Sequence, residues 1–142
     1  MAADAWVFHD RYKEFMGDNT IDMDGDTFEM RLYTSASNIA TTSVGDATTA
    51  TNEVSGNGYA ADVLATTWTR SGGTVTWDSD DGVFTASGGS ITARFAAIID
   101  TTTTPDEVVC HSLLDNTPAD VTVTDGNSLT VQINVSGINT LT

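Results

Sequence analysis

The sequence is poor in cysteine, proline and basic residues. Its 142 residues include one cysteine, two prolines and five lysines and arginines, against 20 aspartates and glutamates. With Cys110 as the only cysteine, no internal disulfide can form. The formal net charge of −15 leaves no clustered Lys and Arg, on which binding to nucleic acids and to anionic membranes depends. We therefore expect no nucleic-acid partner and no membrane partner.

Long apolar runs are absent as well. The first ten residues, M-A-A-D-A-W-V-F-H-D, lack a basic region followed by an apolar one, so we expect no secretory signal peptide. No stretch approaches the roughly 18 apolar residues of a membrane-spanning helix. The composition, rich in Thr, Gly and Ser and poor in Lys, is nevertheless typical of proteins that work outside cells. A virus-particle component reconciles these observations, because it is made in the host cytoplasm and functions outside it.

The sequence contains 25 threonines, and its apolar residues alternate over short stretches. Threonine is β-branched and favours extended backbone. Alternation of period two, typical of strands, occurs in residues 28–33, 91–100, 129–135 and 138–142, and strand patterns also occur in residues 63–70, 74–77 and 108–114. In residues 91–100 it predicts one face made of Ile91, Ala93, Phe95, Ala97 and Ile99. We expect a mainly β protein, an antiparallel β-sandwich or barrel of about seven strands with one short N-terminal helix.

The helix pattern is confined to the N-terminus. Asp4 is placed to cap a helix that ends at Gly17. Between them, aromatic and apolar residues recur at helical spacing, namely Phe8, Tyr12, Phe15 and Met16. We divide the chain into an N-terminal segment, residues 1–17, and a single β-sandwich domain, residues 18–142. Within that domain, residues 35–51 predict a long loop, because they contain few large side chains.

Candidate catalytic residues are few. The histidines are His9 and His111, and Cys110 adjoins His111. Neighbours in a strand point to opposite faces, so Cys110 should be a buried apolar residue and His9 a surface or partly packed residue on the helix flank. With 20 acids, some carboxylate pair is always close, which removes any glycosidase signal. Trp68 and Trp77 are expected to pack as a cross-strand pair. We therefore predict no catalytic residues and no enzymatic activity.

An acidic turn raises the question of a metal site. The stretch D-M-D-G-D, Asp22 to Asp26, resembles a calcium loop, but no register places the acids, the glycine and the final glutamate as an EF-hand requires. A looser Ca²⁺ site formed by Asp22, Asp24 and Asp26 stays open. A tight solvated turn is the preferred interpretation, so we predict no metal and no cofactor.

A glycine-containing stretch, N-E-V-S-G-N-G-Y from Asn52, could in principle cradle a phosphate. It lacks the G-x-G-x-x-G spacing, and no helix follows whose N-terminus could receive the phosphate. We interpret the stretch as a turn in which Gly56 and Gly58 adopt unusual φ values.

Five blocks of sequence occur in a characteristic order. They are I-D-M-D-G-D-T-F from Ile21, L-Y-T-S from Leu32, N-E-V-S-G-N-G-Y from Asn52, T-W-T-R-S-G from Thr67 and I-T-A-R-F-A-A-I-I-D from Ile91. In this order they resemble a family of small structural proteins of tailed bacteriophage particles, over about Tyr12 to Asp100. The resemblance implies a β-sandwich virion protein without catalytic activity. It does not distinguish head from tail.

On this resemblance we expect a capsid decoration, or cement, protein located on the capsid surface of the virion. Its partner would be the major capsid protein, and it would form a symmetric oligomer, a trimer or dimer. Binding to the assembled shell, and not to dissociated subunits, would stabilise the head. The predicted contact residues are Trp6, Phe8 and Arg11, which combine apolar area with scarce positive charge.

Three alternatives stay open. Trp6 and Phe8 could instead fill the domain's own core. The protein could be a tail, neck or fibre component. It could also be a host- or glycan-binding adhesin module, which exposed Trp or Tyr residues on loops would favour.

Overall fold

The structure, a computed structural model, describes residues 4–142 and confirms a mainly β protein with one short helix. Over that range the elements are β1 (Val7–Phe8), α1 (Asp10–Gly17), β2 (Phe28–Tyr33), β3 (Asp62–Val63), β4 (Thr66–Ser71), β5 (Thr74–Ser79), β6 (Gly82–Thr85), β7 (Ile91–Ala93), β8 (Phe95–Asp100), β9 (Glu107–Leu113), β10 (Val121–Val123), β11 (Ser128–Val131) and β12 (Asn139–Leu141). The strands outnumber the seven expected because two predicted strands are each split and some are very short. In residues 4–142 no helix is both long and apolar enough to cross a membrane.

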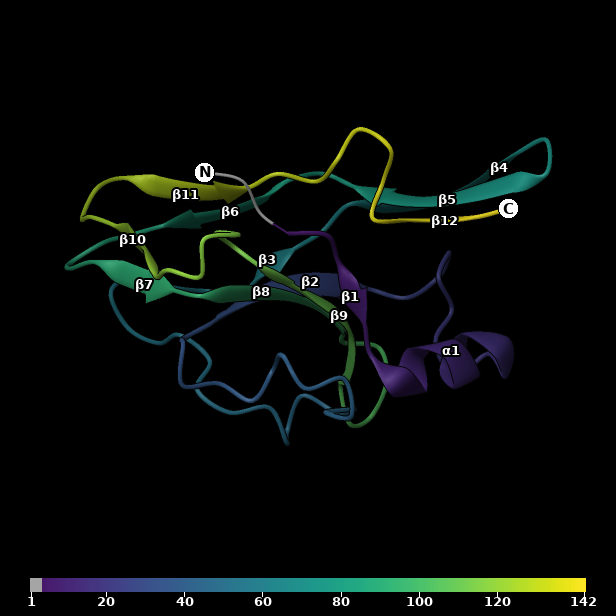
Figure 1. Ribbon diagram of the computed structural model, residues 1–142, viewed down its shortest axis with the longest axis horizontal. Coiled ribbons are helices and arrows are strands. Elements are labelled where there is room, and N and C mark those ends of the chain that lie inside the picture. The colour runs from purple at the N-terminus through teal and green to yellow at the C-terminus, as the bar shows by residue number, and fades with distance from the viewer. Residues whose placement is uncertain (1–3) are drawn as a thin grey trace.

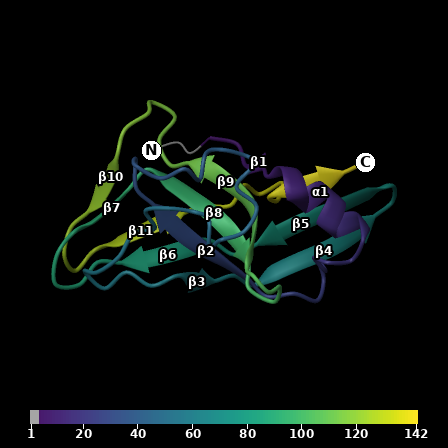
Figure 2. The same cartoon turned by 90° about the horizontal axis from the view of Figure 1, so that it is seen from below.

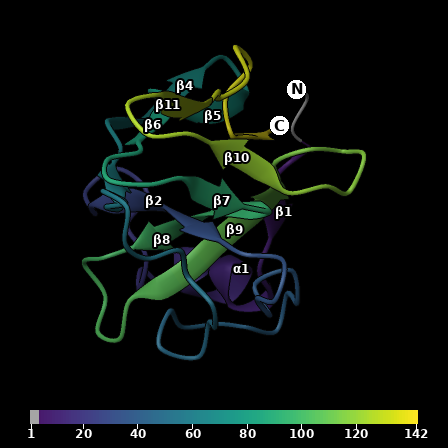
Figure 3. The same cartoon turned by 90° about the vertical axis from the view of Figure 1, so that its left-hand side faces the viewer.

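A five-stranded antiparallel sheet in the order β1-β9-β8-β2-β3 forms the middle layer. In Figure 1 the smaller sheets β12-β5-β4 and β11-β6 lie above it, and α1 and the loop after β2 lie below it. Figure 3 shows the same layers end-on, with β7 and β10 between the upper and middle layers. The sheets stay open, so the arrangement is sandwich-like.

Both faces of the middle sheet are buried. The larger apolar cluster lies between the layers and includes Trp77, Phe28 and Phe84. The smaller cluster includes Ile39 and Val44 from the predicted loop. That loop is therefore present as expected, and it covers the sheet. Each fully buried Val or Ile side chain contributes about 1.5–3 kcal/mol relative to an exposed one.

The predicted strand over residues 91–100 is interrupted at Arg94, and the single apolar face assigned to it is wrong. The Arg94 backbone N–H donates to the Tyr33 carbonyl at 2.8 Å, and the interruption shifts the alternation by one residue. The larger cluster contains Ile91, Ala93, Ala96 and Ile98, whereas the smaller one contains Phe95, Ala97 and Ile99. A strand buried on both faces needs apolar residues at consecutive positions, which the run A-A-I-I provides.

The helix begins later than the sequence predicted. Val7 and Phe8 are extended and pair with His111 and Cys110 of β9, and α1 starts only at Asp10. Asp4 does not cap the helix; its backbone N–H donates to the Leu113 carbonyl at 2.9 Å. Pairing with the edge of the middle sheet satisfies backbone groups that a longer helix would have bonded internally.

The stretch that follows Asn52 is a turn, as predicted. Asn52, Gly56, Asn57 and Gly58 all have positive φ, the conformation that glycine and asparagine tolerate best. At its end, the Tyr59 hydroxyl accepts from the Leu32 N–H at 3.0 Å and donates to Glu53 at 2.8 Å. The block therefore has a structural role, joining the turn to the sheet.

Candidate binding groove beside the N-terminal strand

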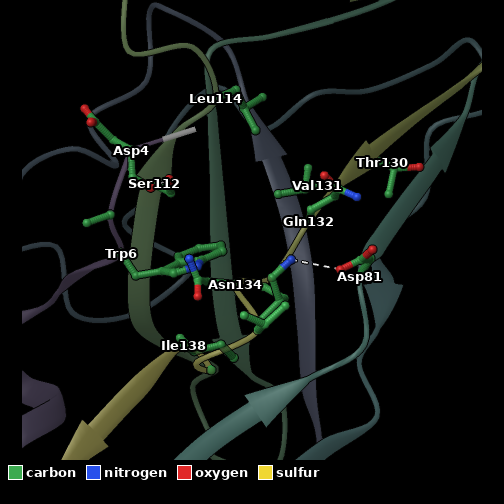
Figure 4. Close-up of a pocket in the computed structure, with 14 residues that line it drawn as sticks. Asp4, Trp6, Asp81, Ser112, Leu114, Thr130, Val131, Gln132, Asn134 and Ile138 are labelled. Carbon is green, nitrogen blue, oxygen red and sulfur yellow. Dashed lines mark hydrogen bonds between the residues drawn. The ribbon is translucent and has the colours of Figure 1, made fainter. Parts of the chain in front are cut away.

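An open groove of about 940 Å³ lies beside the N-terminal segment. One wall consists of residues 4–6 with the end of β9, and the opposite wall is the segment 130–138. Figure 4 shows the Trp6 side chain reaching into the space between these walls, with Leu114 above it and Val131 on the opposite wall. The volume lies within the range of small-molecule sites.

The N-terminal wall is fixed by backbone pairing and one side chain. Beyond the Asp4 N–H bond to β9, the Ser112 hydroxyl donates to the Asp4 carbonyl at 2.8 Å. Ser112 is buried and Asp4 is exposed, so this part-buried bond ties the wall to β9.

The opposite wall is held at both ends. The Ile133 N–H donates to the Asp81 carboxylate at 2.8 Å, and the Ile138 N–H donates to the Trp77 carbonyl at 2.7 Å. Between them the chain turns at Gly137, whose φ is +87°. A Cβ there would lie 2.7 Å from the Trp77 carbonyl oxygen, so only glycine fits this position.

Trp6 is the aromatic residue of the groove. It is half-buried and packs partly against the larger core cluster. The polar side chains around the groove include Gln132 and Asn134, together with the acids Asp4 and Asp81. No basic residue of the described chain lines the groove. Its charge therefore favours neutral or basic ligands over anions.

The structure does not bring the three predicted contact residues together. Trp6 lines the groove. Phe8 packs inward, with its ring centroid 4.9 Å from that of Tyr12, so the core alternative describes it. Arg11 lies on α1, where a guanidinium nitrogen is 2.9 Å from a Glu107 carboxylate oxygen. Of the three, Trp6 is the residue placed to meet a partner in this groove.

A buried histidine pair, which no sequence pattern predicted, lies beneath the covering loop. His9 is fully buried, which corrects its expected place at or near the surface. Its Nδ1 lies 2.5 Å from the Val44 carbonyl oxygen, and its Nε2 lies 2.9 Å from Nδ1 of His111. His9 therefore donates to Val44 through Nδ1–H and accepts the Nδ1–H of His111. The pair ties β1, β9 and the covering loop together.

Burial controls the protonation of these histidines. Desolvation lowers the pKa of His9 despite its bond to Val44, and it lowers the pKa of His111 to about 4, with the charge of His9 adding to the effect. Both rings are accordingly neutral near pH 7. The helical pattern of the N-terminal segment did not indicate the histidine pair, because His9 precedes α1.

Cys110 is buried as predicted, and burial raises the pKa of its thiol. It belongs to the larger cluster, whereas the ring of His111 contacts His9 and Phe95 on the other face of the sheet. The expected separation of the two side chains is confirmed. Trp68 and Trp77 are directly opposite each other on β4 and β5, which confirms the predicted cross-strand pair.

The acidic turn uses its carboxylates to bond its own backbone. Asp22 accepts the N–H groups of Asp24 and Gly25 at 3.1 and 3.2 Å, and Asp26 accepts that of Asp22 at 2.7 Å. Over residues 4–142 no group of three or more His, Cys, Asp or Glu side chains is arranged to hold a metal ion. These contacts support the solvated-turn interpretation.

Comparison with known proteins gives no relative: no family model, no curated protein and no solved structure matches the chain.

Proposed function

We propose that this protein is a bacteriophage virion structural protein, a capsid decoration protein that acts by binding the major capsid protein. The five ordered sequence blocks support the virion assignment. The observation that carries the binding role is Trp6, a half-buried aromatic residue held on the wall of an open groove.

The groove suits recognition of a polypeptide segment. Its walls are fixed by hydrogen bonds to Asp4 and Asp81, so little conformational entropy is lost when a partner binds. Aromatic residues at the centre of an interface commonly supply most of the binding energy. The acidic lining selects a neutral or basic segment of the capsid protein.

The mechanism is stabilisation by mass action. A ligand that binds only the assembled shell stabilises it by about 2.7 kcal/mol per site when its free concentration is 100 times Kd. Repeated over many symmetry-related sites, this shifts the balance from dissociated subunits toward the intact head. A dimer or trimer would add avidity.

The first test is the copy number per particle, measured by quantitative mass spectrometry and normalised to the major capsid protein. Hundreds of copies in a fixed ratio support decoration of the head. A handful to a few tens indicates the tail, neck or fibres instead. Absence from purified particles overturns the virion proposal.

The second test asks whether the groove is the contact. Thr130→Arg places a bulky cation at the rim of the groove, whereas Thr122→Arg makes the same change on β10, outside it. Both threonines are exposed, so both variants should fold. We expect Thr130→Arg, like Trp6→Ala, to bind undecorated shells at least tenfold more weakly, and Thr122→Arg to bind normally. Equal binding by the two arginine variants rejects the groove.

A second candidate is a glycan-binding adhesin module. Trp6 lies outside the strands and is half-buried, so it meets only the loop part of what such a module is expected to show, an exposed aromatic residue on a loop. An aromatic face beside Gln132 and Asn134 combines a stacking surface with amide hydrogen bonds. Saturable quenching of Trp fluorescence by a neutral oligosaccharide, lost in Trp6→Phe, together with absence from particles, favours this function.

A further inference from the structure

One side of β4 has no neighbouring strand in the part of the chain that the structure describes. β4 is the edge of the sheet β12-β5-β4, and Figure 2 shows it along the outer side of that sheet. It is joined to β5 by a two-residue turn, with Ser71 paired to Thr74. In such hairpins the pair that closes the turn is hydrogen-bonded, and hydrogen-bonded pairs then alternate. The N–H and C=O groups of Thr66, Trp68 and Arg70 therefore point away from β5.

This edge has little of the usual protection against pairing, with Arg70 as its one charged residue. Natural edge strands are blunted by lysines, prolines, bulges or covering segments. β4 is six residues long and pairs with β5 in continuous register. Its sequence, T-T-W-T-R-S, contains neither lysine nor proline.

The distribution of charge favours a second copy of the chain at this edge. Residues 63–77 contain no acid and one base, Arg70, in a protein of net charge −15. Arg70 is exposed and forms no ion pair with any residue in 4–142. The strand itself therefore brings no acid and one unpaired cation to a second copy, and the acids beside it, Asp22 and Asp24, line a shallow pocket with Trp68.

We propose that β4 pairs with β4 of a second copy across a twofold axis. A twofold axis makes the two strands antiparallel and the contact self-complementary. With the axis at Trp68, that residue lies opposite Trp68 of the partner subunit, and Thr66 lies opposite Arg70 of the partner subunit. The two three-stranded sheets then join into one of six strands.

This register uses the outward-pointing groups of both strands. The three residues that present free N–H and C=O groups on one strand meet the same three on the other. Arg70 lies diagonal to Trp68 of the partner subunit, within reach of its ring face for a cation–π contact. No carboxylate of either strand enters the interface, because β4 has none.

The proposal specifies the oligomer expected of a decoration protein, and it does not depend on the groove. The groove is formed by residues 4–6 and 130–138 with their neighbours, none of which lies in β4. A protein that binds shells but does not dimerise contradicts the β4 proposal alone. A protein that dimerises but does not bind shells contradicts the proposed function alone.

Sedimentation velocity over a concentration series tests the dimer. Arg70→Pro and Thr66→Pro remove outward N–H groups without removing a bond to β5, whereas Arg70→Ala and Thr66→Ala keep those groups. We expect a dimer for the wild type and both alanine variants, and at least tenfold weaker self-association for the proline variants. A monomeric wild type, or proline variants that dimerise normally, overturns the proposal.

Amide hydrogen exchange tests the pairing in the wild type, without a substitution that could disturb folding. The amides of Trp68 and Arg70 should gain protection as the protein concentration rises. Fast exchange of both amides at every concentration contradicts the pairing. Protection that appears only when shells are added would assign the edge to a strand of the capsid protein instead.

Discussion

Asp100 makes a pH-dependent contribution to stability that can be measured directly. It is fully buried at the end of β8, and its Oδ1 accepts the Thr102 N–H at 2.8 Å. Its Oδ2 is buried and has no hydrogen-bond partner among residues 4–142. Burial, together with the neighbouring carboxyl of Asp26, raises the pKa of Asp100 from 3.8 to about 7. In the folded protein the protonated acid is therefore favoured.

The sign of the effect follows from linkage. The folded pKa lies above the unfolded one, so the contribution of Asp100 to stability is fully present below pH 3.8 and is lost as the pH rises through 7. Each pKa unit corresponds to about 1.4 kcal/mol. Between pH 5 and pH 7 Asp100 alone should lower the free energy of unfolding by about 2 kcal/mol.

Asp100→Asn tests this contribution. The asparagine keeps an oxygen for the Thr102 N–H, offers an N–H toward Asp26, and cannot ionise. We expect the variant to exceed the wild type in stability by about 2–4 kcal/mol at pH 8, with the gain about 2.5 kcal/mol smaller at pH 5. Urea unfolding followed by Trp fluorescence at several pH values measures both.

The control for Asp100→Asn is Asp24→Asn, which makes the same change in net charge at an exposed position of the acidic turn. The control should show neither the gain at pH 8 nor its decline toward pH 5. If Asp100→Asn is no more stable than the wild type at pH 8, or if its gain is the same at every pH, the buried-carboxyl argument is wrong.

Three further predictions concern stability. The folded pKa of His111 is lowered to about 4, so its contribution to stability is present above pH 6.5 and is lost as the pH falls through 4. The free energy of unfolding of the wild type should therefore fall by about 2 kcal/mol between pH 7 and pH 5 through His111. His111→Gln should not show this fall, as measured by urea unfolding at both pH values. Gly58→Ala should cost more than Gly56→Ala by about 1–3 kcal/mol, because both have positive φ but a Cβ at Gly58 alone would meet neighbouring atoms; equal midpoints in urea contradict this. Arg11→Met should destabilise the protein by about 1–3 kcal/mol, because it leaves the buried Glu107 carboxylate without its cation. The loss of stability should be larger at pH 8 than at pH 5, and a loss that does not depend on pH contradicts the ion-pair account.

Local patterns predicted β2 well, because the residues on its two faces differ in polarity. Phe28, Met30 and Leu32 alternate with more polar residues, and β2 occupies the predicted range. The turn at Gly56 and Gly58 was predictable for a similar reason, because the requirement for positive φ lies within the stretch itself. In both cases the information is contained within a few consecutive residues.

Patterns failed where the deciding contact is distant in sequence. The period of residues 91–100 gave one face, but the backbone bond between Arg94 and Tyr33 interrupts the strand and exchanges the faces. Phe8 matches a helical stripe with Tyr12, yet pairing with β9 makes it extended. Tertiary pairing outweighs helical periodicity when a segment lies at an open sheet edge.

The pairing of β1 with β9 at the edge of the middle sheet also explains why the candidate site could be predicted only in part. Trp6 stood out as a large aromatic residue in the N-terminal segment, but its groove needs residues 130–138, which no local pattern connects to it. The extended course of β1 places Trp6 on this wall and also carries His9 under the covering loop. Had α1 begun at Asp4, both side chains would lie on a helix, and neither the groove nor the histidine pair could form. The single choice between strand and helix at Val7 therefore determines the core beneath the loop and the surface that we propose binds the capsid.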